Sequence, residues 1–442
     1  MFHTKTILTL GVRRFIMVFL ITLFFIISPI IILYTAGYTY DTKNHQIKTR
    51  GTLSITVVPK KASITLNGIP LPEKTPLRLK HRSPGSYHII IKKDGYKPWE
   101  TNSIIESNKT TYLHNIQLFK DQPFTLKIDV EKNQIYPSHN GSHIIIKKDK
   151  AETQEGLLFT PQSINPVTLF RVTTKNTPII MWSPFNTHTA LIHETKNGTD
   201  VQIIDPKNID KKRTWHTTTT PQIQWAKQSG NPTIFIKEKS QITKFSDNST
   251  IIHTEIASDI WYVDEKEHVW EYDNQKKTLI KTDTDSNQDE QYILNEIITN
   301  IIDVFDTHVI VQTANATKSI PRKKENTIQT ISAKNTTYNP IDDTWIIWSE
   351  HEIWKIKNTG EVVLLNRTGE KIKEVTIIDK YEGLVVLTDK GLFAFDPRHN
   401  VKIALTQTPF TDIQKVRVDN KKRRIIFFGK TTEKQGIFEL QF

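Results

Sequence analysis

The sequence predicts an all-β protein with one N-terminal transmembrane helix, then a small antiparallel β-sandwich, then a seven- or eight-bladed β-propeller. Three observations predict this class. An uncharged apolar run stands near the amino terminus. Alternating apolar and polar residues follow it up to about residue 119, as in half-buried strands. Pairs of short strands then recur at intervals near 40 residues along the rest of the 442 residues, which is the period of propeller blades.

The apolar run FIMVFLITLFFIISPIIIL, residues 15–33, is long enough to cross a membrane as a helix, which takes about 20 residues. No charged residue occurs between Arg14 and Asp41. A cleaved signal peptide ends in small residues, whereas cleavage after Ala36 would place the bulky Tyr34 at the −3 position. We therefore expect a retained helix.

The expected segments are a cytoplasmic tail over 1–14, a transmembrane helix over 15–36 and a linker over 37–50. Arg13 and Arg14 abut the helix and favour a cytoplasmic amino terminus. Basic residues also follow the helix, so the charge count alone is ambiguous, but long domains are exported largely regardless of charge. We expect a single-pass protein of the cell membrane with extracytoplasmic C-terminal domains. The basic residues that follow the helix are Lys43, Lys48, Arg50, Lys60 and Lys61.

A small β-domain is expected over 51–119. Four segments, SITVVP, ASITLNG, YHIIIKKDGY and TYLHNIQLF, alternate with period two. Turn residues separate them, as at Asn67-Gly68 and Asp94-Gly95. Four to six short strands in this length predict an antiparallel sandwich.

This segment resembles the PEGA domain, a small β module of bacterial and archaeal surface proteins. It follows the order of a P-x-x-A-x-I-x-L-x-G strand, a T-P turn, a P-G-x-Y-x-I-x-I strand and a closing G-Y pair. The resemblance implies envelope association and partner binding, and it implies no chemistry. The matching positions are Pro59, Ala62, Ile64, Leu66, Gly68, Thr75, Pro76, Pro84, Gly85, Tyr87, Ile89, Ile91, Gly95 and Tyr96.

Residues 120–442 are expected to form the propeller. About eight strand pairs centre near residues 152, 197, 239, 267, 310, 350, 389 and 432, and the interval from 239 to 267 is short. The segment WSPFNTHTALI, 182–192, resembles the W-S-P-D-G segment of TolB-like propellers, with Phe185 and Asn186 in place of Asp and Gly. The last segment, GIFELQF, alternates as a strand. We expect it to complete a blade begun near 124–130, because an open array leaves sheet edges exposed.

The formal charge is +12, and we expect the excess to be spread along the chain, where it favours anionic partners such as wall polymers or lipid headgroups. There is no cysteine, which excludes disulfides, thiolate metal sites and cysteine nucleophiles. No recognition-helix or base-stacking pattern is present, so no nucleic-acid partner is expected.

No nucleotide-binding, zincin or G-x-S-x-G pattern occurs among the 442 residues. His351-Glu352 lacks a second histidine at zincin spacing and is expected in a hairpin turn. We therefore expect no catalytic, cofactor-binding or metal residues. The alternating oxygens of an acidic run resemble a calcium loop, but Gln288 and Leu294 replace its glycine and bidentate glutamate. We expect a solvated loop. The run comprises Asp283, Asp285, Asn287 and Asp289.

Two further features have structural interpretations. The tryptophans of the array are expected in blade cores or between blades. The run Arg322-Lys323-Lys324 lies in a polar stretch, 314–339, that lacks periodicity and is expected to be a long exposed loop. The tryptophans are Trp182, Trp215, Trp225, Trp261, Trp270, Trp345, Trp348 and Trp354.

The expected function is non-catalytic. We expect a membrane-anchored extracytoplasmic binding or scaffolding protein of the cell envelope, with an envelope protein or an anionic wall polymer as its partner. The alternative is a polysaccharide-active propeller enzyme of the envelope, which converging carboxylates at the propeller mouth would favour. A transmembrane sensor is disfavoured, because the short segment before the helix leaves no room for a signalling domain.

Overall fold

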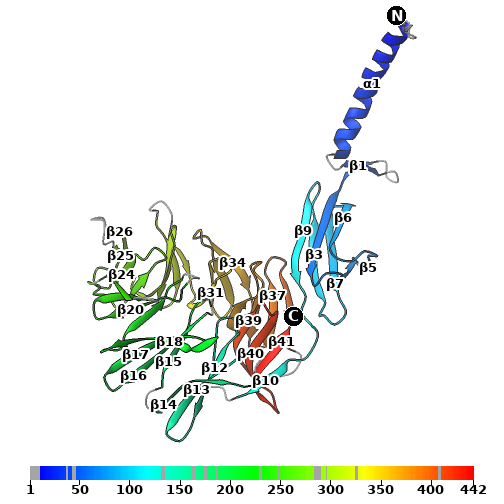
Figure 1. The fold of residues 1–442 in the computed structure, drawn as a ribbon. Helices are drawn as coiled ribbons and strands as arrows, with labels where there is room; N and C mark the ends of the chain where they lie inside the picture. The colour runs from blue at the N-terminus through cyan, green and yellow to red at the C-terminus, as the bar shows by residue number, and fades with distance from the viewer. Residues whose placement is uncertain are drawn as a thin grey trace, which may run out of the picture. The chain divides into compact units, whose positions relative to one another are not determined.

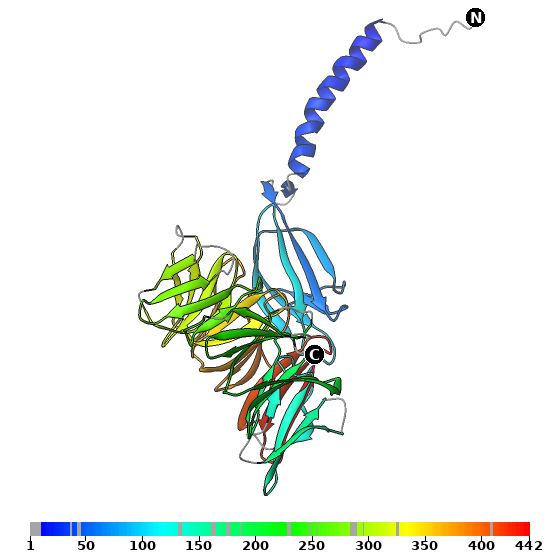
Figure 2. The ribbon, with the colours of Figure 1, turned by 60° about the vertical axis from the view of Figure 1, so that its left-hand side comes forward.

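The computed structural model describes residues 10–442 except 36–37, 42–45, 131–134, 161–164, 174–176, 186, 228–230, 247–248, 254, 283–289, 295, 324–326 and 407–409. The chain divides into two compact units (Figures 1 and 2). The first comprises Met1–Asp121 with His399–Val401, and the second comprises Gln122–Arg398 with Lys402–Phe442.

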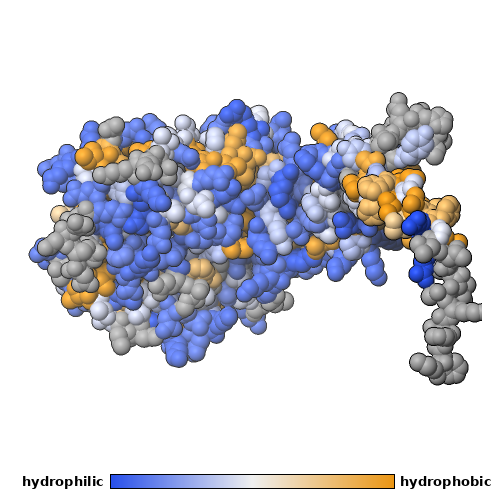
Figure 3. All heavy atoms as spheres, turned by 90° about the horizontal axis from the view of Figure 1, so that it is seen from above, coloured by the Kyte–Doolittle hydropathy of each residue, from blue (hydrophilic) through white to orange (hydrophobic). Residues whose placement is uncertain are grey.

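The chain's one described α-helix, α1 (Leu10–Thr35), carries the apolar run. It begins five residues before the expected start at 15 and so includes Arg13 and Arg14. Its segment Gly11–Thr35 is long and apolar enough to cross a membrane. Its large apolar side chains, such as Phe15 and Phe25, are exposed. Figure 3 shows hydrophobic residues at the surface of the part of the chain that carries the helix. A short antiparallel hairpin of β1 (Tyr38–Asp41) and β2 (Gln46–Thr49) follows, within the expected linker.

The sandwich consists of two sheets. One has the order β6-β3-β9 and the other β5-β4-β7-β8. Apolar residues alternate along β3, where Leu53, Ile55 and Val57 are buried. The expected antiparallel pairing holds except between β3 and β9, which pair in parallel. The strands are β3 (Gly51–Val58), β4 (Ser63–Leu66), β5 (Ile69–Pro70), β6 (Leu77–Arg82), β7 (Gly85–Lys92), β8 (Trp99–Ile105) and β9 (Thr110–Gln117).

The second unit contains eight four-stranded antiparallel sheets within the described residues, which gives an eight-bladed propeller. We number the blades in chain order. Blade 1 has β11 (Ile135–Pro137), β12 (Ile144–Asp149), β13 (Thr153–Phe159) and β14 (Val167–Thr173); blade 2 has β15 (Ile179–Trp182), β16 (Thr189–Thr195), β17 (Gly198–Asp205) and β18 (Asn208–Thr217). Blade 3 has β19 (Gln222–Trp225), β20 (Ile234–Glu238), β21 (Gln241–Phe245) and β22 (Ser249–His253); blade 4 has β23 (Trp261–Val263), β24 (Val269–Asp273), β25 (Thr278–Thr282) and β26 (Glu290–Ile293).

The remaining blades follow the same plan. Blade 5 has β27 (Ile298–Val304), β28 (His308–Thr313), β29 (Thr317–Pro321) and β30 (Gln329–Ile331); blade 6 has β31 (Asn335–Asn339), β32 (Thr344–Trp348), β33 (Glu352–Ile356) and β34 (Val362–Arg367). Blade 7 has β35 (Ile372–Ile377), β36 (Leu384–Thr388), β37 (Gly391–Asp396) and β38 (Val401–Ala404). Blade 8 combines β39 (Asp412–Asp419), β40 (Arg424–Lys430) and β41 (Gln435–Gln441) with β10 (Thr125–Asp129).

The first and last strands of the propeller close the ring. β10 pairs with β41, with Leu126 opposite Phe438, as expected for the terminal segment. Figure 1 shows cyan β10 beside red β41. Blade 8 also packs on blade 1, because Ile426, Phe428 and Ile437 share an apolar core with residues of β11 and β12. Similar cores join the other neighbouring blades, and Arg417 of blade 8 pairs with Glu374 of blade 7.

The expected strand pairs coincide with second and third strands in six blades. The pair near 267 is instead the first hairpin of blade 4, formed by β23 and β24, and position 310 lies inside β28. This explains the short interval after 239. A blade contains three hairpins, and in blade 4 the aromatic strands are the first two.

The expectation of a long exposed loop over 314–339 is wrong. This stretch contains β29, β30 and β31. Outer and inner strands of a blade have one solvated edge and short apolar runs, so periodicity in the sequence is weak there. Ser319 and Ile320 of β29 are buried nevertheless.

Candidate functional site

The first strand of each blade lies at the inner edge of its sheet. Neighbouring first strands lie beside one another, as β35 does beside β39. Their free edges are partly capped by side chains: the Gln224 amide donates to the Val263 carbonyl oxygen at 2.8 Å and accepts from its backbone N–H at 2.9 Å. Such capping satisfies groups that would otherwise attract another strand.

A buried lysine joins blades that are not neighbours. Lys227 follows β19 of blade 3, and its Nζ lies 2.7 Å from Asp303 Oδ2 of blade 5. It also lies 2.5 Å from Asp343 Oδ1 of blade 6 and 3.8 Å from Glu265 Oε1 of blade 4. Blades 3 and 6 are separated by two blades in the ring. The contact therefore runs across the central region of the propeller, at the end where the first and second strands turn.

Aromatic groups surround this ammonium group. Lys227 Nζ lies 4.2 Å from the ring centroid of Phe305 and 4.7 Å from that of Tyr338, within cation–π range. The Tyr338 hydroxyl donates to Asp343 at 2.9 Å. Burial and the neighbouring Asp343 raise the pKa of Tyr338 well above its usual value.

Asp303 is the most buried member of the cluster, with 1% of its side chain exposed. Its carboxylate accepts from the Tyr262 hydroxyl at 2.8 Å and from the Trp345 indole N–H at 2.7 Å. With Lys227, these donors compensate the cost of burying a charge. Burial and the adjacent Asp303 raise the pKa of Tyr262, which keeps this donor protonated.

We call Lys227, Glu265, Asp303 and Asp343 the central cluster. Burial raises the pKa of Glu265, its outermost acid. The three carboxylates lie close together, as the acid and base of a hydrolytic enzyme do. They surround the ammonium group of Lys227, however, and not a substrate. The ion pairs of Lys227 link blades 3, 4, 5 and 6, and the cluster's outer acids form an acidic rim.

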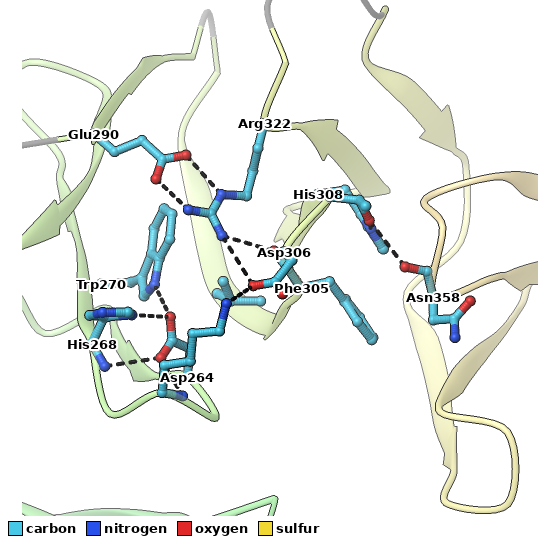
Figure 4. A network of polar contacts seen from close by, with 12 residues as sticks. Asp264, His268, Trp270, Glu290, Phe305, Asp306, His308, Arg322 and Asn358 are labelled. Carbon is cyan, nitrogen blue, oxygen red and sulfur yellow. Dashed lines mark hydrogen bonds and ion pairs between the residues drawn. The ribbon is translucent and has the colours of Figure 1, made fainter.

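A second network lies beside it, between blades 4 and 5 (Figure 4). Asp264 accepts from the Trp270 indole N–H at 3.0 Å and from the His268 backbone N–H at 2.9 Å. The Arg322 guanidinium group forms two parallel bonds to Glu290, at 2.8 and 2.5 Å, and covers the Trp270 ring. Arg322 thereby lowers the pKa of Glu290, against the effect of burial.

His308 opens β28 next to the central cluster. Its ring stacks on Phe305 with the centroids 4.6 Å apart. The side chain is buried, and within the described residues its Nε2 atom has no hydrogen-bond partner. Burial, then the charge of Lys227, lowers the pKa of His308 to about 4. The neutral imidazole therefore predominates at neutral pH.

The charge excess is not spread along the chain, contrary to expectation. Residues 1–121 contain 17 Lys and Arg against 6 Asp and Glu, whereas residues 122–442 contain 42 against 41. Within the propeller, residues 255–296 around blade 4 carry 4 basic and 12 acidic residues. Residues 412–442 of blade 8 carry 8 basic and 4 acidic ones. Three blades separate blades 4 and 8 on either side, so the acidic and basic blades are opposite in the ring.

The sequence-based candidates fall outside these clusters or have structural roles. Asp283, Asp285, Asn287 and Asp289 lie outside the described residues. Among the described residues, no three His, Asp or Glu side chains gather as metal ligands would. His351 lies in the turn before β33, as expected, and Glu352 begins that strand.

Arg322 of the basic run and the tryptophans also have structural roles. Arg322 is bound to Glu290, and Lys323 follows it just after β29. All eight tryptophans of the array are buried or half-buried in apolar cores that join neighbouring blades. Sequence reasoning missed Lys227, Asp303 and Asp343. The only signal in the sequence is that each of these charges stands two residues from an aromatic residue, as Lys227 does from Trp225.

The fold defines the class of the protein: an eight-bladed β-propeller preceded by a small β-sandwich and a membrane-length apolar helix. Residues 50–132 match the model of the PEGA domain, so the chain contains a PEGA domain, as the resemblance predicted. No curated protein matches the chain.

Several solved structures are similar to parts of this chain. An uncharacterized protein of Listeria monocytogenes is 12% identical with a TM-score of 0.41, covering 66% of this chain and 99% of its own. The β-propeller domain of Cps50 (Swd1) from Myceliophteria thermophila is 10% identical with a TM-score of 0.38, covering 72% and 99%. Apo AztD from Citrobacter koseri is 11% identical with a TM-score of 0.37, covering 68% and 94%. The blade count rests on the strand pairing of this chain and not on these likenesses.

Proposed function

We propose that this chain is a non-catalytic, single-pass membrane protein of the cell envelope whose extracytoplasmic propeller binds a protein partner. The helix α1 is the anchor. Arg13 and Arg14 precede most of it and favour a cytoplasmic amino terminus.

The observation that carries the binding role is the opposition of acidic blade 4 and basic blade 8 in one ring. Charges of both signs on one rigid scaffold steer and orient a partner with the complementary pattern. A uniformly anionic wall polymer would be attracted to blade 8 and repelled by blade 4. A protein partner therefore fits the propeller better than the polymer does.

The central cluster supports a binding role over catalysis. Lys227 forms ion pairs with the two acids that converge most closely, Asp303 and Asp343. An acid–base pair for hydrolysis needs carboxylates open to substrate and water. Here the innermost carboxylate is nearly fully buried.

A charge-reversal pair tests this proposal. Glu255 and Glu433 are both exposed, the first in the acidic segment before blade 4 and the second in basic blade 8. Glu255→Lys and Glu433→Lys change the total charge equally. Each full-length variant would be crosslinked in intact cells, and crosslinked proteins identified by mass spectrometry.

The expected result is one specific partner whose crosslinking yield falls severalfold in Glu255→Lys and is unchanged in Glu433→Lys. Equal loss in both variants would point to non-specific electrostatics. Salt-sensitive binding of purified wall polymer would favour the polymer as partner, and turnover of a polysaccharide would favour the enzyme alternative.

A further inference from the structure

The segment just after the helix carries a large net positive charge. Residues 50–121 carry 12 Lys and Arg against 5 Asp and Glu. Strand β6 presents Arg78, Lys80 and His81 to solvent, while Leu79 between them is buried. Arg82 ends this strand opposite Gly51, the first residue of β3. We call Arg50, Arg78, Lys80, His81 and Arg82 the basic end of the PEGA domain.

The chain connection holds the basic end close to the end of α1. Fifteen residues separate Thr35 from Gly51, but the hairpin folds them back, with Tyr38 opposite Thr49. Two residues link the helix to Tyr38, and one links Thr49 to β3. From standard backbone and strand spacings, Gly51 lies at most roughly 25 Å from Thr35. The Tyr34 ring also stacks on that of His81, with the centroids 6.3 Å apart.

The three basic side chains of β6 are not paired with carboxylates among the described residues. Within the described residues, Arg78, Lys80 and Arg82 form no salt bridge, and Arg82 Nε has no hydrogen-bond partner. Glu106, in the turn beside Gly51, is paired with Lys109. Positive charge held this close to a bilayer is attracted to anionic headgroups within about a Debye length, roughly 8 Å at physiological salt.

We propose that the basic end docks the PEGA domain on anionic lipid headgroups at the membrane surface where α1 emerges. The inference rests on the proposed role of α1 as a membrane anchor. Docking would fix the first unit against the bilayer.

The domain offers a matched control at its opposite end. Lys60 and Lys92 are exposed, and Lys92 lies opposite Ser63 at the start of β4. Along β3 this end is about 23 Å from Gly51, which lies opposite Arg82, and about 13 Å from Ser54, which lies opposite Arg78. Arg78→Gln/Lys80→Gln and Lys60→Gln/Lys92→Gln remove the same charge from opposite ends.

The test uses the full-length protein in lipid nanodiscs. Because the chain has no cysteine, one introduced cysteine gives a unique label site. Ser107→Cys, in the exposed turn between β8 and β9, reports on the basic end, and Ser63→Cys reports on the opposite end. Energy transfer from each label to a headgroup fluorophore would be compared between zwitterionic discs and discs containing phosphatidylglycerol.

In phosphatidylglycerol discs we expect stronger transfer at position 107 than in zwitterionic discs, with little change at position 63. Arg78→Gln/Lys80→Gln should lower the ratio of docked to undocked protein by about 25-fold, since each cation near the surface contributes roughly fivefold. Lys60→Gln/Lys92→Gln should leave the ratio within about twofold. High salt should abolish the difference between lipids.

Equal transfer in both lipids, equal loss in both variants, or docking that resists high salt would overturn the inference. Docking in zwitterionic discs only after soluble polyphosphate is added would assign the basic end to a soluble polymer instead. If the protein failed to insert into discs at all, the anchor itself would be contradicted, which is a distinct result.

Discussion

Lys227 and Asp343 lie 116 residues apart in the sequence and 2.5 Å apart in the structure, between Nζ and Oδ1. They belong to blades 3 and 6, so their contact crosses the centre of the ring. Asp303 of blade 5 shares the same ammonium group at 2.7 Å. A single side chain therefore joins four consecutive blades, 3 to 6, at the centre of the ring.

Replacing Lys227 should destabilise the propeller. Lys227→Met leaves Asp303 buried without its cation, and removing one partner of a buried ion pair costs about 3 kcal/mol or more. The expected fall in Tm, measured by calorimetry, is roughly 4–5 °C or more for a domain of this size. The exposed pair of Lys357 with Glu361 provides the control. Lys357→Met should change stability by less than about 0.5 kcal/mol. Equal effects of the two variants would contradict the role assigned to the cluster.

Stability should fall as the pH falls from about 6.5 towards 4. The pKa of His308 is about 4 in the folded chain, below its unfolded value, so the unfolded chain binds more protons in this window. The pKa values of His143 and His188 are also lowered, mainly by burial. His308→Phe should therefore lose less stability on acidification, by about 3 kcal/mol at most. Denaturant titrations at several pH values measure this.

His216 should affect the pH dependence of stability in the opposite direction. Its hydrogen bond to Asp200 raises its pKa, so the stability it contributes is present at low pH and is lost as the pH rises through its folded pKa. His216→Gln should therefore steepen the loss on acidification. If both histidine variants changed the slope in the same sense, the assignment of the shifts would be wrong.

Ring closure should be sensitive to one methyl group at Gly436. This residue has φ of +153°, and a Cβ atom there would lie 2.0 Å from the Ile128 carbonyl oxygen of β10. Gly436→Ala should push β10 off β41 and lower the Tm. Gly369→Ala, whose new Cβ meets nothing within 4 Å, should be neutral. Deleting 436–442 should destabilise the whole propeller and not merely fray one end; an unchanged Tm would refute closure by β10 and β41.

Membrane fractionation tests the anchor, and protease treatment of intact cells tests its orientation. If α1 spans the membrane, the protein should stay with membranes in alkaline carbonate, and protease added to intact protoplasts should degrade the propeller. A soluble mature form beginning near Gly37 would contradict the anchor. Digestion only after lysis would invert the orientation.

Much of the fold could be predicted from local patterns. The PEGA domain shows its turn residues and alternation in the sequence, and six of eight blades show their central hairpins. Both depend on residues within about 15 positions of each other. The parallel pairing of β3 with β9 could not be predicted this way, because it joins strands at opposite ends of the domain.

The central cluster could not be predicted at all. Which charges meet across a ring depends on the number of blades and on ring closure, and neither is visible in the residues around Lys227. Likewise, Arg322 lies 32 residues from Glu290. In the sequence it stands in an aperiodic polar stretch, which explains why a loop was expected where the structure has strands.

Closure by β10 and β41 also bears on how the protein is made. The Gln435 side chain reaches the Val130 carbonyl, 305 residues earlier in the chain. At a bacterial or eukaryotic elongation rate of roughly 5–20 residues per second, the first strand waits roughly 15–60 s for its partner. Throughout that interval the nascent propeller is an open stack with an unpaired strand, vulnerable to proteases and to association with other nascent chains. A chain that ends before β41 would leave β10 without its partner strand, so the ring would stay open.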